Sequence, residues 1–223
     1  MSSSPIDYEK HLLPNGMEVL FYPESHTYEC EGKTLLSVTT LLKNKYGDKY
    51  AAVPPDLLKR AADYGTAVHK QIQDLVEMRD SVLDDPEALL SESIDLFKYQ
   101  EVENYFKLVE PIYKITPQTM EKVVLLFDES GVPAAAGRFD MYGTVDGAPT
   151  LIDIKTTSVI NRQSVTAQLN LYLTAAQQSG YFDPSIDIKL GVVHLSGETG
   201  RFVPIPTLAK GFYKGFLPEG GKT

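Results

Sequence analysis

The sequence predicts an α/β fold organised as one domain, on three observations. Its length of 223 residues suits a single domain with elaborations. Apolar residues recur at helical spacing up to Val109, but they fill both faces of an extended segment from Glu121 to Phe127. A helical pattern then returns over residues 163–179. A chain of this length buries roughly 70–75% of its unfolded surface, which excludes folds that depend on disulfides for a core.

The first 42 residues are expected to form two short strands and the start of a helix. Residues 17–22 and 26–36 have strand-type patterns, with turn residues at 23–25 and 31–33. Ser37 then stands where a helix N-cap is needed, because its hydroxyl can accept a hydrogen bond from a free backbone N–H.

Helical patterns fill the next segment. An amphipathic stretch opens at the two prolines of 54–55, is expected to break at 65–66 and resumes through Arg79. An aspartate followed by a proline at 85–86 is a helix-start signal. Apolar residues over 93–109 again recur at helical spacing.

Strands dominate the C-terminal half. The extended segment 121–127 is followed by a turn at 128–131 and a strand that reaches Val145. Asp146-Gly147 then forms a tight turn. The remaining expected elements are a strand over 151–156, a helix over 163–179 that ends at Gly180, and a hairpin of 186–195 with 201–205.

The total charge argues against a nucleic-acid-binding protein, but its distribution does not. There are 21 Lys and Arg against 30 Asp and Glu, a net charge of −9, whereas nucleic-acid-binding domains are usually basic. Residues 71–110 hold 3 basic and 11 acidic residues, while residues 43–70 hold 6 and 3. If three acidic residues that could face a metal are left out of the count, residues 111–223 have a net positive charge. The pattern predicts a basic cleft between 43–70 and 111–223, with the acidic helices turned away.

The cellular setting is expected to be a reducing cytoplasm. Cys30 is the single cysteine, and residues 1–16 contain no apolar run of the kind found in signal peptides. No stretch approaches the ~18 apolar residues that cross a bilayer, so no membrane association is expected.

One predicted hairpin holds the residues with the clearest chemical meaning. If its loop is centred on 146–147, Asp140 lies opposite Asp153. Opposed side chains have Cβ atoms about 4.5–5.5 Å apart, where like charges are destabilising. A hard divalent cation between the carboxylates would explain their pairing. Lys155 falls on the same strand face as Asp153.

These groups suit phosphodiester hydrolysis, in which a metal activates water and a lysine orients that water or neutralises developing charge. The alternative is structural: Asp140 and Asp153 would be exposed loop-end residues and Lys155 an ordinary strand-end cation. The same register places Arg138 opposite Lys155, two cations that repel unless a phosphate lies over them. Arg138 is therefore a candidate phosphate contact.

The hairpin also resembles a known family. Gly137 to Asp140 (G-R-F-D), with Asp153 to Lys155 (D-I-K) starting thirteen residues after Asp140, resembles the PD-(D/E)XK nuclease superfamily, in particular its RecB-like and phage exonuclease branch. Phe139 stands where superfamily members often have proline, although many RecB-like members also lack it. Three flanking segments strengthen the resemblance: 65–69 (G-T-A-V-H), 168–172 (Q-L-N-L-Y) and 28–42, which contains S-V-T.

The resemblance implies a restriction-endonuclease-like core, with a central mixed β-sheet flanked by helices. The whole chain, 1–223, is then one nuclease-like domain. Its expected parts are an N-terminal hairpin and helix start (1–50), a helical segment with the histidine motif (51–110), the core sheet and helix (111–205) and a tail (206–223).

The resemblance also implies a metal site. Asp140, Asp153 and His69 would hold Mg²⁺ or Mn²⁺ together with the backbone carbonyl of Ile154. An imidazole ligand favours Mn²⁺ more than an all-oxygen site does. Glu121, at the start of the preceding strand, is a further candidate ligand, with a solvent-exposed strand end as the alternative.

Other side chains take roles around that metal. Lys155 would act on the attacking water, and Gln168 and Tyr172, four residues apart on one helix face, would contact the DNA. Ile72 and Val76 follow His69 at three and seven residues, so the imidazole points toward the packed side of its helix. The alternative for His69 is an ordinary core histidine.

The function expected from these residues is a divalent-metal-dependent DNA nuclease, with an exonuclease of phage or prophage origin favoured, acting in recombination or DNA end processing. DNA is the expected partner, with room for a recombination or single-strand-binding protein and for an oligomer. Two alternatives are a non-catalytic DNA-binding or assembly subunit that keeps the nuclease fold, and a small-molecule hydrolase or metal-binding module.

Overall fold

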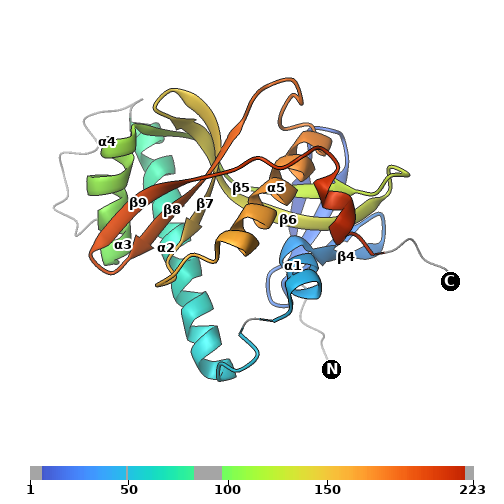
Figure 1. The fold of residues 1–223 in the computed structure, drawn as a ribbon, viewed down its shortest axis with the longest axis horizontal. Helices are drawn as coiled ribbons and strands as arrows, with labels where there is room; N and C mark the ends of the chain where they lie inside the picture. Colours follow the sequence, from blue (N-terminus) through green and yellow to red (C-terminus); the bar gives the residue numbers. More distant parts are fainter. Residues whose placement is uncertain (1–6, 49, 83–96, 219–223) are drawn as a thin grey trace.

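A nine-stranded mixed sheet organises the protein (Figure 1). The computed structural model describes residues 7–48, 50–82 and 97–218. The strands are β1 (Glu9–Leu12), β2 (Glu18–Tyr22), β3 (Thr27–Cys30), β4 (Lys33–Ser37), β5 (Ile115–Phe127), β6 (Pro133–Val145), β7 (Ala148–Lys155), β8 (Lys189–Ser196) and β9 (Thr199–Ile205).

Strand β6 is the centre of this sheet. Along one edge it pairs antiparallel with β5. Along the other edge its C-terminal half pairs antiparallel with β7 and its N-terminal part pairs parallel with β4. Strand β8 lies parallel to β7 and antiparallel to β9, and β1 to β4 form an antiparallel extension. The expected α/β fold with a central mixed sheet is confirmed.

Helices cover both faces of the sheet. Helices α1 (Val38–Tyr46) and α5 (Arg162–Gln178) pack on one face, and α5 crosses in front of β5 and β6 in Figure 1. The other face is covered by α2 (Pro55–Val82), α3 (Gln100–Asn104), the π-helix η2 (Tyr105–Val109) and α4 (Glu110–Tyr113). A 3₁₀ turn, η3 (Phe212–Phe216), follows β9. None of the described helices has the length and apolar character that crossing a membrane requires.

The predicted break in the helical segment at residues 65–66 is wrong, because α2 continues from Pro55 to Val82. Its buried stripe of Val68, Ile72 and Val76 packs on the sheet, and this tertiary packing outweighs the weak helix propensity of glycine. A Cβ at Gly65 would lie 3.3 Å from Thr156 Oγ1, so the glycine lets the helix pass close to the end of β7.

Other boundaries differ from expectation in smaller ways. The hydroxyl of Ser37 caps α1 as predicted, accepting from the Thr40 N–H. Strand β1 was not predicted, and β5 begins six residues before Glu121 and includes Pro117. Within the expected helix 93–109, the described helical residues begin at Gln100. The helix start at 85–86 lies outside the described residues.

The first prediction concerns Gly143, where β6 passes the start of β5. A Cβ there would lie 2.2 Å from the carbonyl oxygen of Thr116, a backbone atom that cannot move without displacing β5. We expect Gly143→Ala to lower the free energy of unfolding by about 1–3 kcal/mol, measured by urea denaturation. Gly215→Ala is the matched control, because a Cβ at Gly215 meets nothing within 4 Å. Equal stability of the two variants would contradict the argument.

Candidate metal centre

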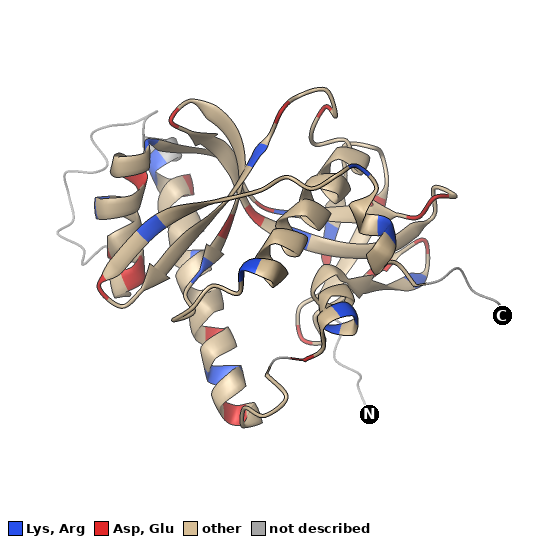
Figure 2. Ribbon diagram, viewed as in Figure 1, with Lys and Arg blue, Asp and Glu red and all other residues tan. Residues whose placement is uncertain are grey.

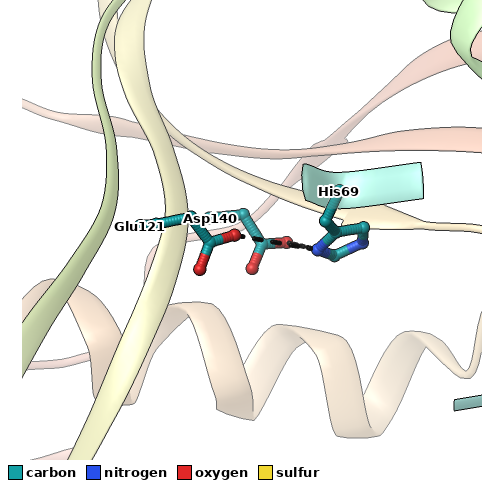
Figure 3. A group of neighbouring side chains, drawn as sticks. All are labelled: His69, Glu121 and Asp140. Atoms are coloured by element: carbon teal, nitrogen blue, oxygen red, sulfur yellow. Dashed lines mark ion pairs between the residues drawn. The ribbon is translucent and has the colours of Figure 1, made fainter. Parts of the chain in front are cut away.

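Three potential metal ligands meet beside the central strands. His69 on α2, Glu121 on β5 and Asp140 on β6 each place one ligand atom within 4.8 Å of the others (Figure 3). His69 Nδ1 is 3.7 Å from Asp140 Oδ2 and 3.9 Å from Glu121 Oε1. Elements distant in sequence therefore converge on one point.

The packing of α2 aims His69 at this point. Ile72 and Val76, on the same helix face, are buried in the core between α2 and the sheet. The His69 side chain is 23% exposed and lines a cleft, so it is anchored by its helix without being enclosed. The expectation that His69 faces the packed side of the helix is confirmed.

The backbone of Glu121 is strained in the middle of a strand. Its φ is 52°, a left-handed conformation that costs a non-glycine residue of order 1–3 kcal/mol. Met120 and Val124, four residues apart, should share a face of β5, yet Met120 packs in the α2 core and Val124 in the α5 core. The side-chain alternation thus reverses at Glu121, which stands among the potential ligands.

Strands β6 and β7 separate at Asp140. Their pairing follows the predicted register from Val145–Ala148 to Met141–Ile152 and ends there. The predicted register is therefore confirmed, but the direct opposition of Asp140 and Asp153 is not, because the ladder ends one pair before them. Two facing carboxylates would repel, and earlier residues of β6 pair with β4 instead.

Asp140 keeps a contact across the separation. Its Oδ2 accepts a hydrogen bond of 2.6 Å from the backbone N–H of Ile154. The predicted opposition of Arg138 and Lys155 is wrong for the same reason, because the two strands are no longer paired at that level. The Asp140 carboxylate thus accepts the hydrogen bond that a backbone carbonyl of β6 would accept if the β6–β7 ladder continued.

Asp153 and Lys155 form a pair next to the three ligands. Asp153 is only 2% exposed, and Lys155 Nζ lies 2.8 Å from each of its carboxylate oxygens, with a hydrogen bond to Oδ1. Their location on one strand face is as predicted. Asp153 Oδ2 is buried and lies at ion-pair distance from Lys155, so one ammonium group serves both oxygens of this carboxylate.

The accumulated charge shifts the titration of these groups. Burial, and then the charge of Asp140, raises the pKa of Glu121 to about 8. Burial raises the pKa of Asp153 to about 6, with Lys155 opposing and Asp140 adding to the effect. Burial by itself would lower the pKa of Lys155, but Asp153 and Asp140 outweigh it and the pKa is raised. Lys155 therefore stays an ammonium ion at neutral pH.

The donor set fits a divalent cation. Ligands at the 2.0–2.6 Å typical of Mg²⁺ or Ca²⁺ lie up to roughly 4–5 Å from one another, which agrees with the 4.8 Å limit found for His69, Glu121 and Asp140. Carboxylate oxygens with one imidazole suit Mg²⁺ and Mn²⁺. The Asp153 carboxylate, which is paired with Lys155, is a further potential donor beside them.

The site opens into a cleft of about 530 Å³. Its charged lining includes the carboxylates of Glu9, Asp63, Glu121 and Asp140, against the cations Lys70 and Arg138. Both cations are bonded to carboxylates, Lys70 to Asp74 and Arg138 to Glu9. The predicted basic cleft is therefore wrong. Figure 2 shows Lys and Arg interspersed with Asp and Glu along the elements.

The other predicted site residues lie around this cleft. Tyr172 is buried and lines the cleft, whereas Gln168 does not line it. A Cβ at Gly137 would lie 2.7 Å from Tyr172 Cε1, which explains the glycine of the G-R-F-D segment. Arg138 donates to Glu9 at 2.6 Å, and its guanidinium lies 4.6 Å from the centre of the Phe21 ring.

The sequence analysis missed one wall of the cleft. Phe21, His26 and Tyr28, from the β2–β3 hairpin, all line it. In the sequence these residues read as two short strands and a turn, and their alternation with polar residues indicates only a half-buried sheet. Nothing local signals that this hairpin lies beside β6.

The second prediction concerns Glu121 in the metal-free protein. An unfolded glutamate ionises near pH 4.5, whereas the folded Glu121 holds its proton to about pH 8. The native state thus binds more protons between these values, and stability falls as the pH rises through them. At about pH 8 and above, we expect Glu121→Gln to unfold at a higher temperature, by roughly 2–4 °C for each kcal/mol gained.

Thermal unfolding in a chelator from about pH 5 to pH 9 measures this effect. The control is Glu198→Gln, an exposed carboxylate at the β8–β9 turn. Added Mn²⁺ should stabilise the parent more than Glu121→Gln. If the stability of the parent and the stability of Glu121→Gln changed with pH in the same way, the proposed penalty on the charged Glu121 carboxylate would be contradicted.

Comparisons with known proteins place the chain in a family. Residues 43–209 match the model of the PD-(D/E)XK nuclease superfamily, which is 167 of 223 residues. No curated protein matches the chain. Among solved structures, the crystal structure of SSO0001 is similar over 79% of this chain and 68% of that chain, with 13% sequence identity and a TM-score of 0.39. The family match covers well over half of the sequence, and the chain belongs to the PD-(D/E)XK nuclease superfamily, whose nucleases use divalent metals.

Proposed function

We propose that this protein is a divalent-metal-dependent deoxyribonuclease, and specifically an exonuclease of the RecB-like and phage branch that acts in recombination or DNA end processing. The observation that supports it most is the convergence of His69, Glu121 and Asp140 beside the buried Asp153–Lys155 pair. A purely structural role would not explain a left-handed glutamate beside two further potential metal ligands.

Each residue has a role in this proposal. His69, Glu121, Asp140 and Asp153 hold Mg²⁺ or Mn²⁺, with the carbonyl of Ile154 as a further donor. The backbone N–H of Ile154 points toward Asp140, to which it donates a hydrogen bond. The N–H and C=O of one strand residue point in the same direction, so the Ile154 carbonyl also points toward Asp140. A divalent cation bound here supplies a polarised phosphoryl oxygen and an acidified water.

Lys155 acts on the water and on the developing charge. It is held by Asp153 at 2.8 Å and remains protonated, so it donates hydrogen bonds and does not act as a base. The attacking water loses a proton to solvent, its oxygen forms a bond to phosphorus as the P–O ester bond breaks, and the leaving oxygen takes up a proton from solvent. Lys155 stabilises the negative charge that builds up on the phosphoryl oxygens.

The acidic cleft predicts that DNA binds only after the cation. Four carboxylates line the cleft, and both lining cations already have carboxylate partners. Without added positive charge this surface repels a phosphate backbone. We expect a Lys155→Gln variant, which keeps all four proposed metal ligands but lacks the ammonium group that acts in cleavage, to bind a short single-stranded DNA at least about 10-fold more tightly with Mg²⁺ or Ca²⁺ than with chelator. Fluorescence anisotropy measures this, and equal affinity in both conditions would contradict the charge argument.

The fourth prediction tests catalysis directly. We expect Asp140→Asn and Asp153→Asn each to lose about 10²–10³-fold or more of the cleavage rate, since each removes a charge that the site is built around. Asp146→Asn is the matched control, because Asp146 lies in the same hairpin but is exposed and paired with Lys114. A linear DNA should shorten progressively while a closed circular DNA stays intact.

Three outcomes of this assay separate the alternatives. A parent protein that leaves linear and nicked DNA uncut with both Mg²⁺ and Mn²⁺ is not the proposed nuclease. If that protein still binds DNA, it is a non-catalytic subunit that keeps the fold. Cleavage of closed circles at the rate of linear DNA would assign an endonuclease instead of an exonuclease.

A further inference from the structure

The β2–β3 hairpin has no part in the chemistry proposed above, yet its tip and inner face form a wall of the cleft. Pro23 and His26 come from the turn, and Phe21 and Tyr28 come from the strands. Residues of α2, including His69 of the metal centre, line the same cleft. The hairpin and the ligand helix thus border one cavity.

His26 is an exposed ring held in a defined position. Its backbone φ is 51°, in the left-handed region that histidine enters more readily than most residues. The ring packs edge-on against Phe21, with centroids 5.4 Å apart and planes at 88°, and against Tyr28, at 6.2 Å and 75°. Two contacts therefore fix the ring while the residue stays exposed to the cleft.

The support under this ring is rigid. Phe21 and Tyr28 are opposite each other on β2 and β3, both are buried, and their ring centroids are 4.8 Å apart. Their neighbours in the core include Val123, Leu125 and Ala136 of β5 and β6. A side chain that is already ordered loses little conformational entropy when it binds a ligand.

Arg138 connects this aromatic wall to the metal centre. It precedes Asp140 by two residues on β6, and its guanidinium lies over the Phe21 ring. One terminal nitrogen donates to Glu9, while the buried Nε has no partner among the described residues. A guanidinium held between an aromatic ring and a metal site can share its charge between Glu9 and a phosphate of a bound strand.

The chemistry of the ring favours a base over a phosphate. Partial desolvation, and then the charge of Arg138, lowers the pKa of His26. The imidazole is therefore neutral at neutral pH and offers a π-face, while Arg138 supplies the positive charge. Aromatic faces bind nucleobases by stacking with little regard to sequence.

We infer that the β2–β3 hairpin is a binding site for an unpaired nucleobase of the DNA strand. The base stacks on His26 and the adjoining phosphate contacts Arg138. A base in a duplex has both faces covered by its neighbours, so this site selects single-stranded or frayed ends. The inference rests on the proposed nuclease function and adds to it that the cleft accepts DNA ends whose bases are unpaired.

The test uses a short single-stranded DNA with the fluorescent base 2-aminopurine at one end or at the other, because stacking quenches this fluorophore. In the Lys155→Gln protein with Mg²⁺, which keeps all the proposed metal ligands, the probe at the bound end should be quenched. Adding His26→Asn, which tolerates the same backbone conformation but lacks a ring, should abolish the quenching and weaken binding about 10-fold.

Two further variants separate stacking from a structural role. His26→Tyr retains a ring and should retain the quenching. Glu24→Gln, at an exposed turn position that does not line the cleft, should behave as the parent. In the cleaving protein, His26→Asn should raise KM about 10-fold with a smaller change in kcat, and thermal unfolding should show that the variant is folded.

The outcomes distinguish this inference from the nuclease proposal. If the parent cleaves DNA and His26→Asn keeps the affinity, quenching and KM of the parent, the stacking site is wrong and the nuclease stands. Equal affinity for blunt duplex and single-stranded ends would also overturn it. If the parent neither binds nor cleaves DNA, the nuclease proposal fails and this inference fails with it.

Discussion

The structure depends on holding three carboxylates close together out of water. Glu121, Asp140 and Asp153 come from three adjacent strands, and burial together with repulsion from Asp140 penalises the charged forms of Glu121 and Asp153. Two local contacts offset part of this cost: Lys155 pairs with Asp153, and the Ile154 N–H binds Asp140. The raised pKa of Glu121 shows that the compensation is incomplete. A divalent cation is the group that would complete it.

The strand geometry accommodates this concentration of charge. A regular hairpin would continue the β6–β7 ladder past Met141 and Ile152 and place carboxylates face to face. The strands part at that point, and the left-handed residue on β5 reverses the side-chain alternation at the same level. Strain of this kind persists only where the surrounding core over-determines it. The buried residues on both sheet faces provide that support.

The same electrostatics shapes the surface around the site. The cleft is acidic and lined by cations that already have partners, so attraction for a polyanion has to come from the bound metal. The aromatic wall of β2 and β3 adds an interaction that does not depend on charge. This combination explains how a chain with a net charge of −9 can belong to a family of nucleases.

The sequence by itself determined the α/β class, the register of the β6–β7 hairpin as far as Met141 and Ile152, the N-cap of α1 at Ser37, the end of α5 before Gly180, and the family. These features are local: they follow from periodicity, turn residues and short motifs. Only the tertiary structure decided where β6 and β7 separate, that Glu121 is left-handed, that Arg138 bonds to Glu9 and that a distant hairpin walls the cleft. Each of these features depends on contacts between segments that are far apart in the sequence. Such contacts decide which strands pair with the edges of β6 and which charges folding brings together, and no local sequence pattern contains that information.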